Sequence, residues 1–123
     1  MNTITLYKRL GGYDAIAAVV DALMVRIKND DKLRRFYIHR GVDGIMREQQ
    51  LLVDYLCAST GGPMVYTGRE IKPLHVGMRL DEEDWKRAMA HLSVTLDAFE
   101  VPEQEKGEVM SFHENLKSDI VEV

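Results

Sequence analysis

Four histidines, His39, His75, His91 and His113, are the side chains of this sequence best suited to bind a metal. None of them has a glutamate three residues before it, so the Glu-x-x-His pattern of di-iron helical bundles is absent. The sequence also contains no His-Glu-x-x-His motif and no paired cysteines, which argues against zinc. Glycine-rich phosphate loops and the Gly-x-Ser-x-Gly elbow of hydrolases are missing as well. These absences disfavour nucleotide and conventional hydrolase chemistry.

His75 has a different setting from the other three histidines. It follows Pro73 closely and is flanked by Leu74, Val76 and Met78, so a short turn could direct its imidazole into apolar surroundings. A core histidine with satisfied hydrogen bonds is the more common outcome in such a setting. The functional alternative is a single protein ligand to haem, since haem iron needs only one histidine from the protein. The residues alone leave both interpretations open.

Helical periodicity dominates the rest of the chain. The first long pattern, over residues 13–29, places Ile16, Val20, Leu23 and Ile27 on one face of an amphipathic helix. We expect further helices over residues 4–10 and 45–59, from Asp81 onward and from Pro102 onward. One more helical turn is expected over residues 32–36.

The breaks between these helices are well marked. Gly11-Gly12 and Gly61-Gly62-Pro63 are helix stop signals, and Asp81 can cap the free amides of the helix that follows it. Residues 38–44 are expected to form a loop. Residues 64–74 are the longest stretch without a periodic pattern, and long loops in compact domains are often functional. The sequence thus predicts an all-α protein with His75 directly after its longest irregular segment.

Composition limits the class of protein. The 123 residues predict one domain, and 16 basic against 20 acidic residues give a net charge of −4, which argues against nucleic-acid binding. No apolar run is long enough to span a membrane, and the first residues lack the pattern of a signal peptide. The single cysteine, Cys57, cannot form an internal disulfide and lies on the inner face of an expected helix. We therefore expect a cytoplasmic protein with Cys57 buried.

A set of short motifs in a fixed order resembles a known family. These motifs run from Leu6-Tyr7-Lys8-Arg9-Leu10-Gly11-Gly12 through Asp30-Asp31-Lys32-Leu33, Gly61-Gly62-Pro63, Tyr66-Thr67-Gly68-Arg69 and Lys72-Pro73-Leu74-His75 to Val101-Pro102. The order is similar to that of group I truncated haemoglobins, and it covers essentially the whole chain. The resemblance implies a globin-like, two-over-two helical sandwich around non-covalent haem b, with His75 as the iron ligand. It also implies binding of O2, CO or NO.

The resemblance further suggests which residues surround the haem. Arg47, Arg69 and Lys72 could pair with the propionates, and Tyr66 could do so through its hydroxyl; a solvated basic surface is the alternative for the cations. Further candidates wall either the haem or the core: Tyr37, Leu52, Leu56, Met78 and Leu116. Relatives that bond a haem vinyl group to a histidine place it near Ser118, so no covalent link is expected.

The distal side departs from the family pattern. Relatives commonly carry a tyrosine where this chain has Met24, and a glutamine or threonine where it has Leu52. Glu48 falls at the gate position, and Gln49, Gln50 or Tyr37 could still supply a hydrogen-bond donor. Met24 is expected to fill space in the core, with ligation of the iron by its thioether as the alternative.

Two other functions stay open at this stage. One is enzymatic turnover of NO, nitrite or peroxide at the haem iron, as an NO dioxygenase, nitrite reductase or peroxidase supplied by a separate reductase. The other is a helical interaction module that has lost its cofactor.

Overall fold

The computed structural model describes residues 4–38, 41–63 and 78–122, and all elements in these ranges are helical. A short helix α1 (Leu6–Arg9) precedes the long α2 (Tyr13–Lys28) and a 3-10 turn η1 (Leu33–Phe36). They are followed by α3 (Val42–Ser59), α5 (Glu82–Ala98), α6 (Glu103–Glu114) and α7 (Lys117–Ile120). None of these helices is long and apolar enough to cross a membrane.

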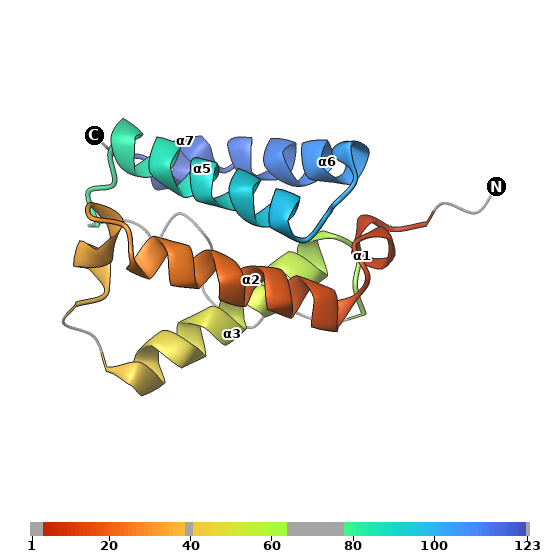
Figure 1. Cartoon of the computed structure of the whole chain (residues 1–123), viewed down its shortest axis with the longest axis horizontal. Coiled ribbons are helices and arrows are strands. Elements are labelled where there is room, and N and C mark those ends of the chain that lie inside the picture. Colours follow the sequence, from red (N-terminus) through yellow and green to blue (C-terminus); the bar gives the residue numbers. More distant parts are fainter. Residues whose placement is uncertain (1–3, 39–40, 64–77, 123) are drawn as a thin grey trace.

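Two pairs of long helices form the body of the protein. Figure 1 shows α2 and α3 crossing in one layer, and α5 and α6 running side by side in the other. This arrangement confirms the expected two-over-two helical sandwich. α2 contacts both α3 in its own layer and α5 in the other layer, because its two apolar flanks pack in opposite directions.

The apolar core has two parts that share α2. Toward α3, Ile16, Val20 and Met24 pack against Val53 and Cys57, and the Cys57 side chain has no exposed surface. Burial raises the pKa of the Cys57 thiol, and the charge of Asp54 raises it further, so Cys57 is the buried, unreactive residue that we expected.

The second part of the core joins α2 to α5. Leu23 packs against Leu92 and Leu96, and half-buried Val109 and Met110 of α6 cover this group. α2 is thus fixed to both of its partner helices.

The glycine pair at the end of α3 allows a close approach to α1. A Cβ atom at Gly62 would lie 2.8 Å from both the Cys57 carbonyl oxygen and the Tyr7 ring. Gly61 has a φ of 98°, in the region that favours glycine. The Tyr7 N–H donates to the Thr60 carbonyl at 2.9 Å, which closes the contact.

Several predicted boundaries differ from the structure. α3 begins at Val42 and so takes in residues 42–44, which were expected to be loop; Gly44 lowers helix propensity there without preventing the helix. The last predicted helix is divided in two by Asn115 and Leu116, and Pro102 precedes the first helical residue. The helix that was expected from Asp81 onward ends at Ala98, and Phe99, the next residue, is 44% exposed.

Candidate functional site

An apolar cluster at the crossing of α2 and α3 contains the residues expected on the distal side. Met24 is 7% exposed and lies in the group formed with Val20, Val53 and Cys57. Half-buried Leu52, Leu56 and Tyr37 pack against the same group. We call Met24, Leu52, Leu56 and Tyr37 the distal cluster. Met24 is held there by apolar contacts, as expected of a residue that fills the core.

The two neighbouring glutamines of α3 are engaged elsewhere. Gln49 donates its amide to an Asp21 carboxylate oxygen at 3.1 Å. Gln50 donates to the Tyr13 hydroxyl at 2.7 Å and to Asp54 at 3.0 Å. Both amides are therefore directed at polar side chains of α2 and α3, which weakens the expectation that either one serves as a distal donor.

Besides the distal cluster, the facing sides of α3 and α6 carry apolar side chains that are only partly buried. α3 buries only Val53 and Cys57 among its 18 residues, and α6 buries none. Tyr55 of α3 and Phe112 of α6 are half-buried and contact each other, with ring centroids 6.1 Å apart. Apolar surface left half exposed between two helices is suited to a flat apolar group such as haem.

A small apolar cavity lies between the two helix layers. It has a volume of about 70 Å³ and includes Leu52 and Leu56 of the distal cluster in its lining. Val20 of α2, Leu96 of α5 and Phe112 of α6 close its other sides. The lining is apolar apart from Thr60 and His113, and cavities lined by apolar side chains stay dry.

The remaining candidate residues are distributed as follows. Arg47 and Glu48 are exposed on α3, Met78 is exposed before α5, and Leu116 is half-buried between α6 and α7. Four of the predicted residues, Tyr66, Arg69, Lys72 and His75, lie outside the described residues, as does His39. The structure thus brings together Met24, Tyr37, Leu52 and Leu56, and it leaves Arg47, Glu48 and Met78 at the surface.

Two of the other histidines, His91 and His113, have hydrogen-bond partners. The Nε2 atom of His91 lies 2.7 Å from an Asp30 carboxylate oxygen. The Nδ1 atom of His113 lies 2.8 Å from the Val109 carbonyl, and burial lowers the pKa of His113 despite that hydrogen bond. His91 therefore links α5 to the end of α2, and His113 is bonded within its own helix.

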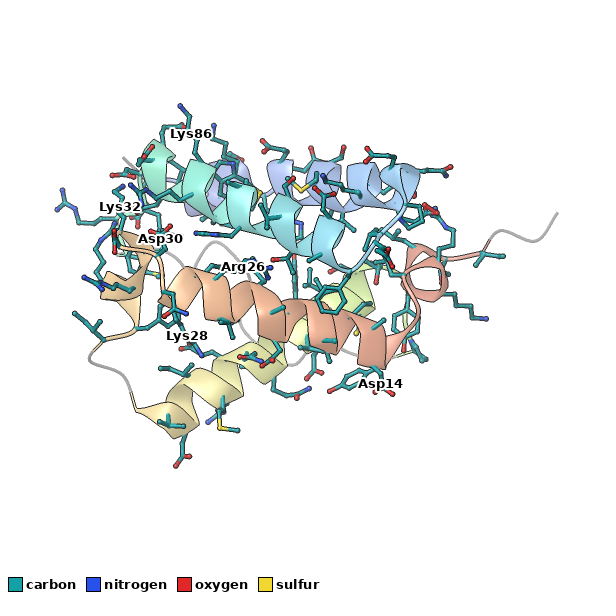
Figure 2. The ribbon with its side chains drawn as sticks, in the orientation of Figure 1. Asp14, Arg26, Lys28, Asp30, Lys32 and Lys86 are labelled. Atoms are coloured by element: carbon teal, nitrogen blue, oxygen red, sulfur yellow. The ribbon has the colours of Figure 1, made fainter. Side chains whose placement is uncertain are left out.

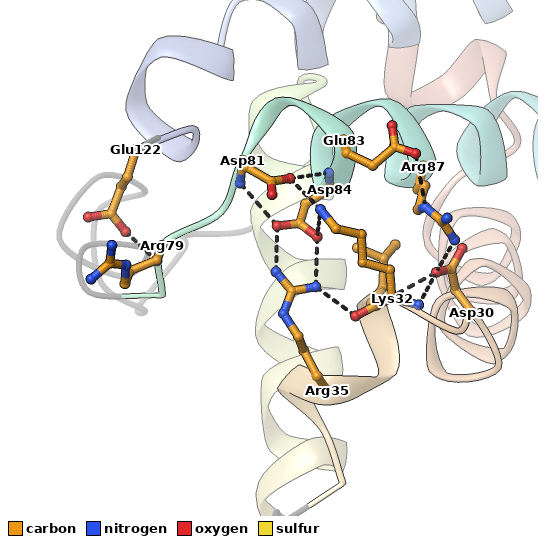
Figure 3. Close-up of polar contacts among 10 residues, drawn as sticks. Asp30, Lys32, Arg35, Arg79, Asp81, Glu83, Asp84, Arg87 and Glu122 are labelled. Carbon is orange, nitrogen blue, oxygen red and sulfur yellow. Dashed lines mark hydrogen bonds and ion pairs between the residues drawn. The ribbon is translucent and has the colours of Figure 1, made fainter.

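A charged network fixes the start of α5 against η1. The Asp84 side chain is 1% exposed and accepts two hydrogen bonds from Arg35, at 2.8 and 2.6 Å (Figure 3). Lys32 pairs with both Asp84 and Asp81. Asp81 and Asp84 also form a capping box, each accepting from the backbone N–H of the other. Burial alone would raise the pKa of the Asp84 carboxyl, but the bonds from Arg35, the Asp81 cap and Lys32 hold it well below its usual range.

Asp30 forms the other half of this network at the end of α2. Its carboxylate accepts from the backbone N–H groups of Lys32 and Leu33 and pairs with Arg87 at 3.1 Å. The hydrogen bond from His91 is the main reason that the pKa of Asp30 lies far below its usual range. Figure 2 shows Asp30 and Lys32 at the end of α2 that faces the beginning of α5, with Arg26 further along α2.

We expect the Asp84→Asn variant to unfold more easily near neutral pH. Loss of the charge-assisted bonds from Arg35 and Lys32 should lower the free energy of unfolding by about 2–4 kcal/mol. A carboxyl whose pKa is depressed in the folded state stabilises above its unfolded pKa, and this contribution disappears as pH falls through the folded pKa. The difference between wild type and variant should therefore shrink below about pH 4. Urea unfolding at pH 7 and at pH 3 measures both effects.

Asp14→Asn is the matched control, because Asp14 is exposed in the first turn of α2. It should change the free energy of unfolding by no more than about 0.5 kcal/mol. Equal losses in the two variants would show that the network does not stabilise the fold. A constant difference from pH 7 to pH 3 would show that the charge of the Asp84 carboxylate is not the cause of the stabilisation.

Sequence reasoning identified Asp81 as a cap but missed its partners. Lys32 and Arg35 lie 49 positions before Asp81 and Asp84, respectively, and no local pattern links them. The pair Asp81 and Asp84, three residues apart before an apolar stripe, was the one signal that could have indicated the capping box.

Comparison with known proteins agrees with this fold. The family model "Bacterial-like globin" matches residues 5–122. A group 1 truncated hemoglobin of Nostoc commune is 34% identical over 88 residues, 72% of each chain. Its counterpart from Mycolicibacterium paratuberculosis is 29% identical over 106 residues, 86% of this chain and 76% of that relative. The crystal structure of the truncated hemoglobin from Tetrahymena pyriformis in the Fe(III) form superposes with a TM-score of 0.87 at 24% identity, covering 98% of this chain and 100% of that one.

These similarities extend over the whole sandwich. The family match begins before α1 and ends after α7, so it includes both helix layers. Globin membership implies haem binding, for which the half-exposed apolar surface of α3 and α6 is suited. The chain therefore belongs to the bacterial-like globin family, within which it is a group 1 truncated haemoglobin.

Proposed function

We propose that this protein binds haem b through His75 and takes up a diatomic gas, O2, CO or NO, at the opposite side of the iron. When bound, haem supplies an iron atom that accepts one ligand from the protein and one from solution. The neutral imidazole of His75 would hold that iron. The observation that carries the proposal is the half-exposed apolar surface around Tyr55 and Phe112 in a chain of globin fold.

The residues around the haem follow from the same proposal. Leu52, Leu56, Met78 and Leu116 would cover the apolar faces of the porphyrin. Arg47, Tyr66, Arg69 and Lys72 would pair with the two propionates. Arg47 is exposed on α3, where a cation can pair with a carboxylate at the rim of a pocket.

The distal cluster determines which gas is favoured. Bound O2 carries negative charge and gains about 1.5–3 kcal/mol from a charge-assisted hydrogen bond. Met24 and Leu52 cannot donate such a bond, and the amides of Gln49 and Gln50 are directed at other partners. Tyr37 is the one member of the distal cluster that carries a hydroxyl. We infer that CO and NO, which depend less on a donor, bind comparatively well. NO dioxygenase activity needs a stable O2 complex and is correspondingly disfavoured.

Three further parts of the proposal concern attachment, partners and location. The haem is held without a covalent link, since the position used for such a link carries Ser118. Gas binding needs no second protein, whereas turnover of NO, nitrite or peroxide would need a separate reductase. A reducing cytoplasm suits a chain whose single cysteine is buried.

The proposal is tested by adding haemin to the purified apoprotein and recording the ferric, ferrous and ferrous–CO absorption spectra. We expect a sharp Soret band that saturates at one haem per chain and shifts when CO is added to the reduced protein. An apoprotein that leaves the spectrum of free haemin unchanged would contradict the proposal and favour a cofactor-free interaction module.

A further inference from the structure

One buried hydrogen-bond donor has no acceptor in the part of the chain that the structure describes. Trp85, the only tryptophan of the sequence, is 7% exposed, and its indole Nε1 atom has no hydrogen-bond partner there. The Oε2 atom of Glu105 is in the same situation, but the other oxygen of that carboxylate lies 3.7 Å from the Arg9 guanidinium. Trp85 is thus a buried donor to which the described residues offer no hydrogen bond.

The chemistry of the indole ring limits what can satisfy this donor. An indole N–H can donate a hydrogen bond but cannot accept one. When it is buried without an acceptor it has lost its hydration without compensation, so buried tryptophans usually reach a partner with their N–H. An unpaired buried group therefore points to an acceptor that these residues do not provide.

Trp85 lies on the inner face of α5, beyond the end of α2. Leu92 lies two turns later on the same face and packs against α2. α2 ends at Lys28, and Asp30, just beyond that end, already pairs with Arg87. The indole of Trp85 therefore lies between the helix layers past the end of α2, and neither core group of the described residues includes it.

On one side, the turn that carries Trp85 is bonded to the segment leading into the distal cluster. Asp84, the residue before Trp85, accepts two hydrogen bonds from Arg35 of η1. η1 ends at Phe36, and the next residue, Tyr37, belongs to the distal cluster. Trp85 is thus fixed next to the element that leads into that cluster.

On the other side, the same turn is bonded to the C-terminal helix. Glu82 pairs with Lys117 of α7 at 2.8 Å, and Figure 1 shows α7 beside the beginning of α5. Lys117 directly follows Leu116, a half-buried residue that we propose to cover the haem. Trp85 therefore lies where two separate groups of proposed haem contacts approach each other.

We propose that the indole N–H of Trp85 donates a hydrogen bond to a propionate oxygen of the haem. This inference rests on the proposed function, since that function supplies the haem. The propionate carboxylates are the strong acceptors that haem b always carries, and each of them can accept from several donors, so Trp85 acts beside the proposed cations. A gas ligand would satisfy the N–H only while it is bound, whereas a propionate does so in every state of the protein.

The test uses the fact that Trp85 is the only tryptophan of the chain. Ultraviolet resonance Raman spectra record the indole band that reports N–H hydrogen bonding, first in the apoprotein and then after reconstitution with haemin. Growth of a tryptophan auxotroph on benzothienylalanine replaces Trp85 alone by an amino acid of the same shape that has sulfur in place of the N–H. Transfer of haem to excess apomyoglobin gives the rate of haem loss.

Two variants complete the design. Trp85→Phe removes the N–H together with part of the ring, so its comparison with the benzothienylalanine protein separates the hydrogen bond from packing. Phe99→Leu is the control for loss of an aromatic ring, because Phe99 directly follows α5 and is 44% exposed.

We expect the indole band to indicate little hydrogen bonding in the apoprotein and a strong hydrogen bond once haemin is bound. The benzothienylalanine protein and Trp85→Phe should lose haem about 10- to 100-fold faster than wild type, the range for one hydrogen bond to a charged group. Phe99→Leu should match wild type. With haemin dimethyl ester, whose propionates carry no charge, the difference between wild type and the benzothienylalanine protein should shrink.

Three results would overturn the inference and leave the proposed function intact. The first is a strong hydrogen bond already present in the apoprotein, since the acceptor would then belong to the protein or its water. The second is normal haem loss from the benzothienylalanine protein, even if Trp85→Phe loses haem quickly, because the ring and not its N–H would then matter. The third is an effect on O2 release alone. Failure of the wild-type protein to bind haemin would overturn both the inference and the proposed function.

Discussion

We expect the His75→Ala variant to lose its haem. The imidazole is the one protein ligand proposed for the iron, and removing a neighbour that merely orients a metal ligand already costs about 10- to 100-fold in affinity. Loss of the ligand itself should exceed that range. The half-exposed apolar surface around Tyr55 and Phe112 would retain only weak, disordered binding of the porphyrin. Titration of the apoprotein with haemin, followed at the Soret band, measures this loss.

Three comparisons separate ligation from a general defect. Alanine at His39 and at His91 should preserve the Soret band, because neither residue is proposed to touch the iron, although His91→Ala also removes a partner of Asp30. His75→Gly should recover a six- or five-coordinate spectrum when imidazole is added, since the free ligand can fill the space left by the side chain. A misfolded variant would not respond to imidazole. A His75→Ala protein with wild-type haem affinity would contradict the assignment of the ligand.

We expect the Met24→Tyr variant to release O2 about 10- to 100-fold more slowly than wild type, the range that corresponds to one charge-assisted hydrogen bond. Met24 is 7% exposed in the distal cluster and makes no donor available to a bound gas. A tyrosine at this position would add a hydroxyl beside Leu52 with a modest increase in volume. Stopped-flow displacement of O2 by CO measures the release rate.

Met24→Phe is the matched control, because it changes the side-chain volume in the same way but carries no hydroxyl. It should release O2 at a rate close to that of wild type, and both variants should release CO at similar rates. Slower O2 release in Met24→Phe, or no difference between Met24→Phe and Met24→Tyr, would show that packing and not a missing donor determines the affinity of the distal side.

The two long helices α2 and α5 were predicted closely from the sequence. The spacing of Ile16, Val20 and Leu23 follows the period of a helix with one buried face, and this local property does not depend on what covers the face. The cap at Asp81 is equally local, since its acceptor and the amide that it satisfies lie three residues apart. The start of α3 was missed because Val42 and Gly44, both exposed in the structure, are weak helix formers.

For the candidate site too, one part could be predicted from the sequence and another could not. Met24 and Leu52 could be assigned to one pocket through resemblance to a family with a known order of motifs, and the structure does bring them into one cluster. The hydrogen bonds that direct the amides of Gln49 and Gln50 to other partners were not predictable, because they depend on which faces of α2 and α3 meet.

By itself, the sequence determined where the long helices run and that Cys57 is buried. Those properties depend on residue types at short spacings, where backbone geometry is nearly fixed. Tertiary structure alone decided the pairing of Asp84 with Arg35 and of Arg79 with Glu122, residues separated by 49 and 43 positions. Such hydrogen bonds form only when the fold brings residues that are distant in the chain within about 3 Å of each other, and no local pattern encodes that proximity.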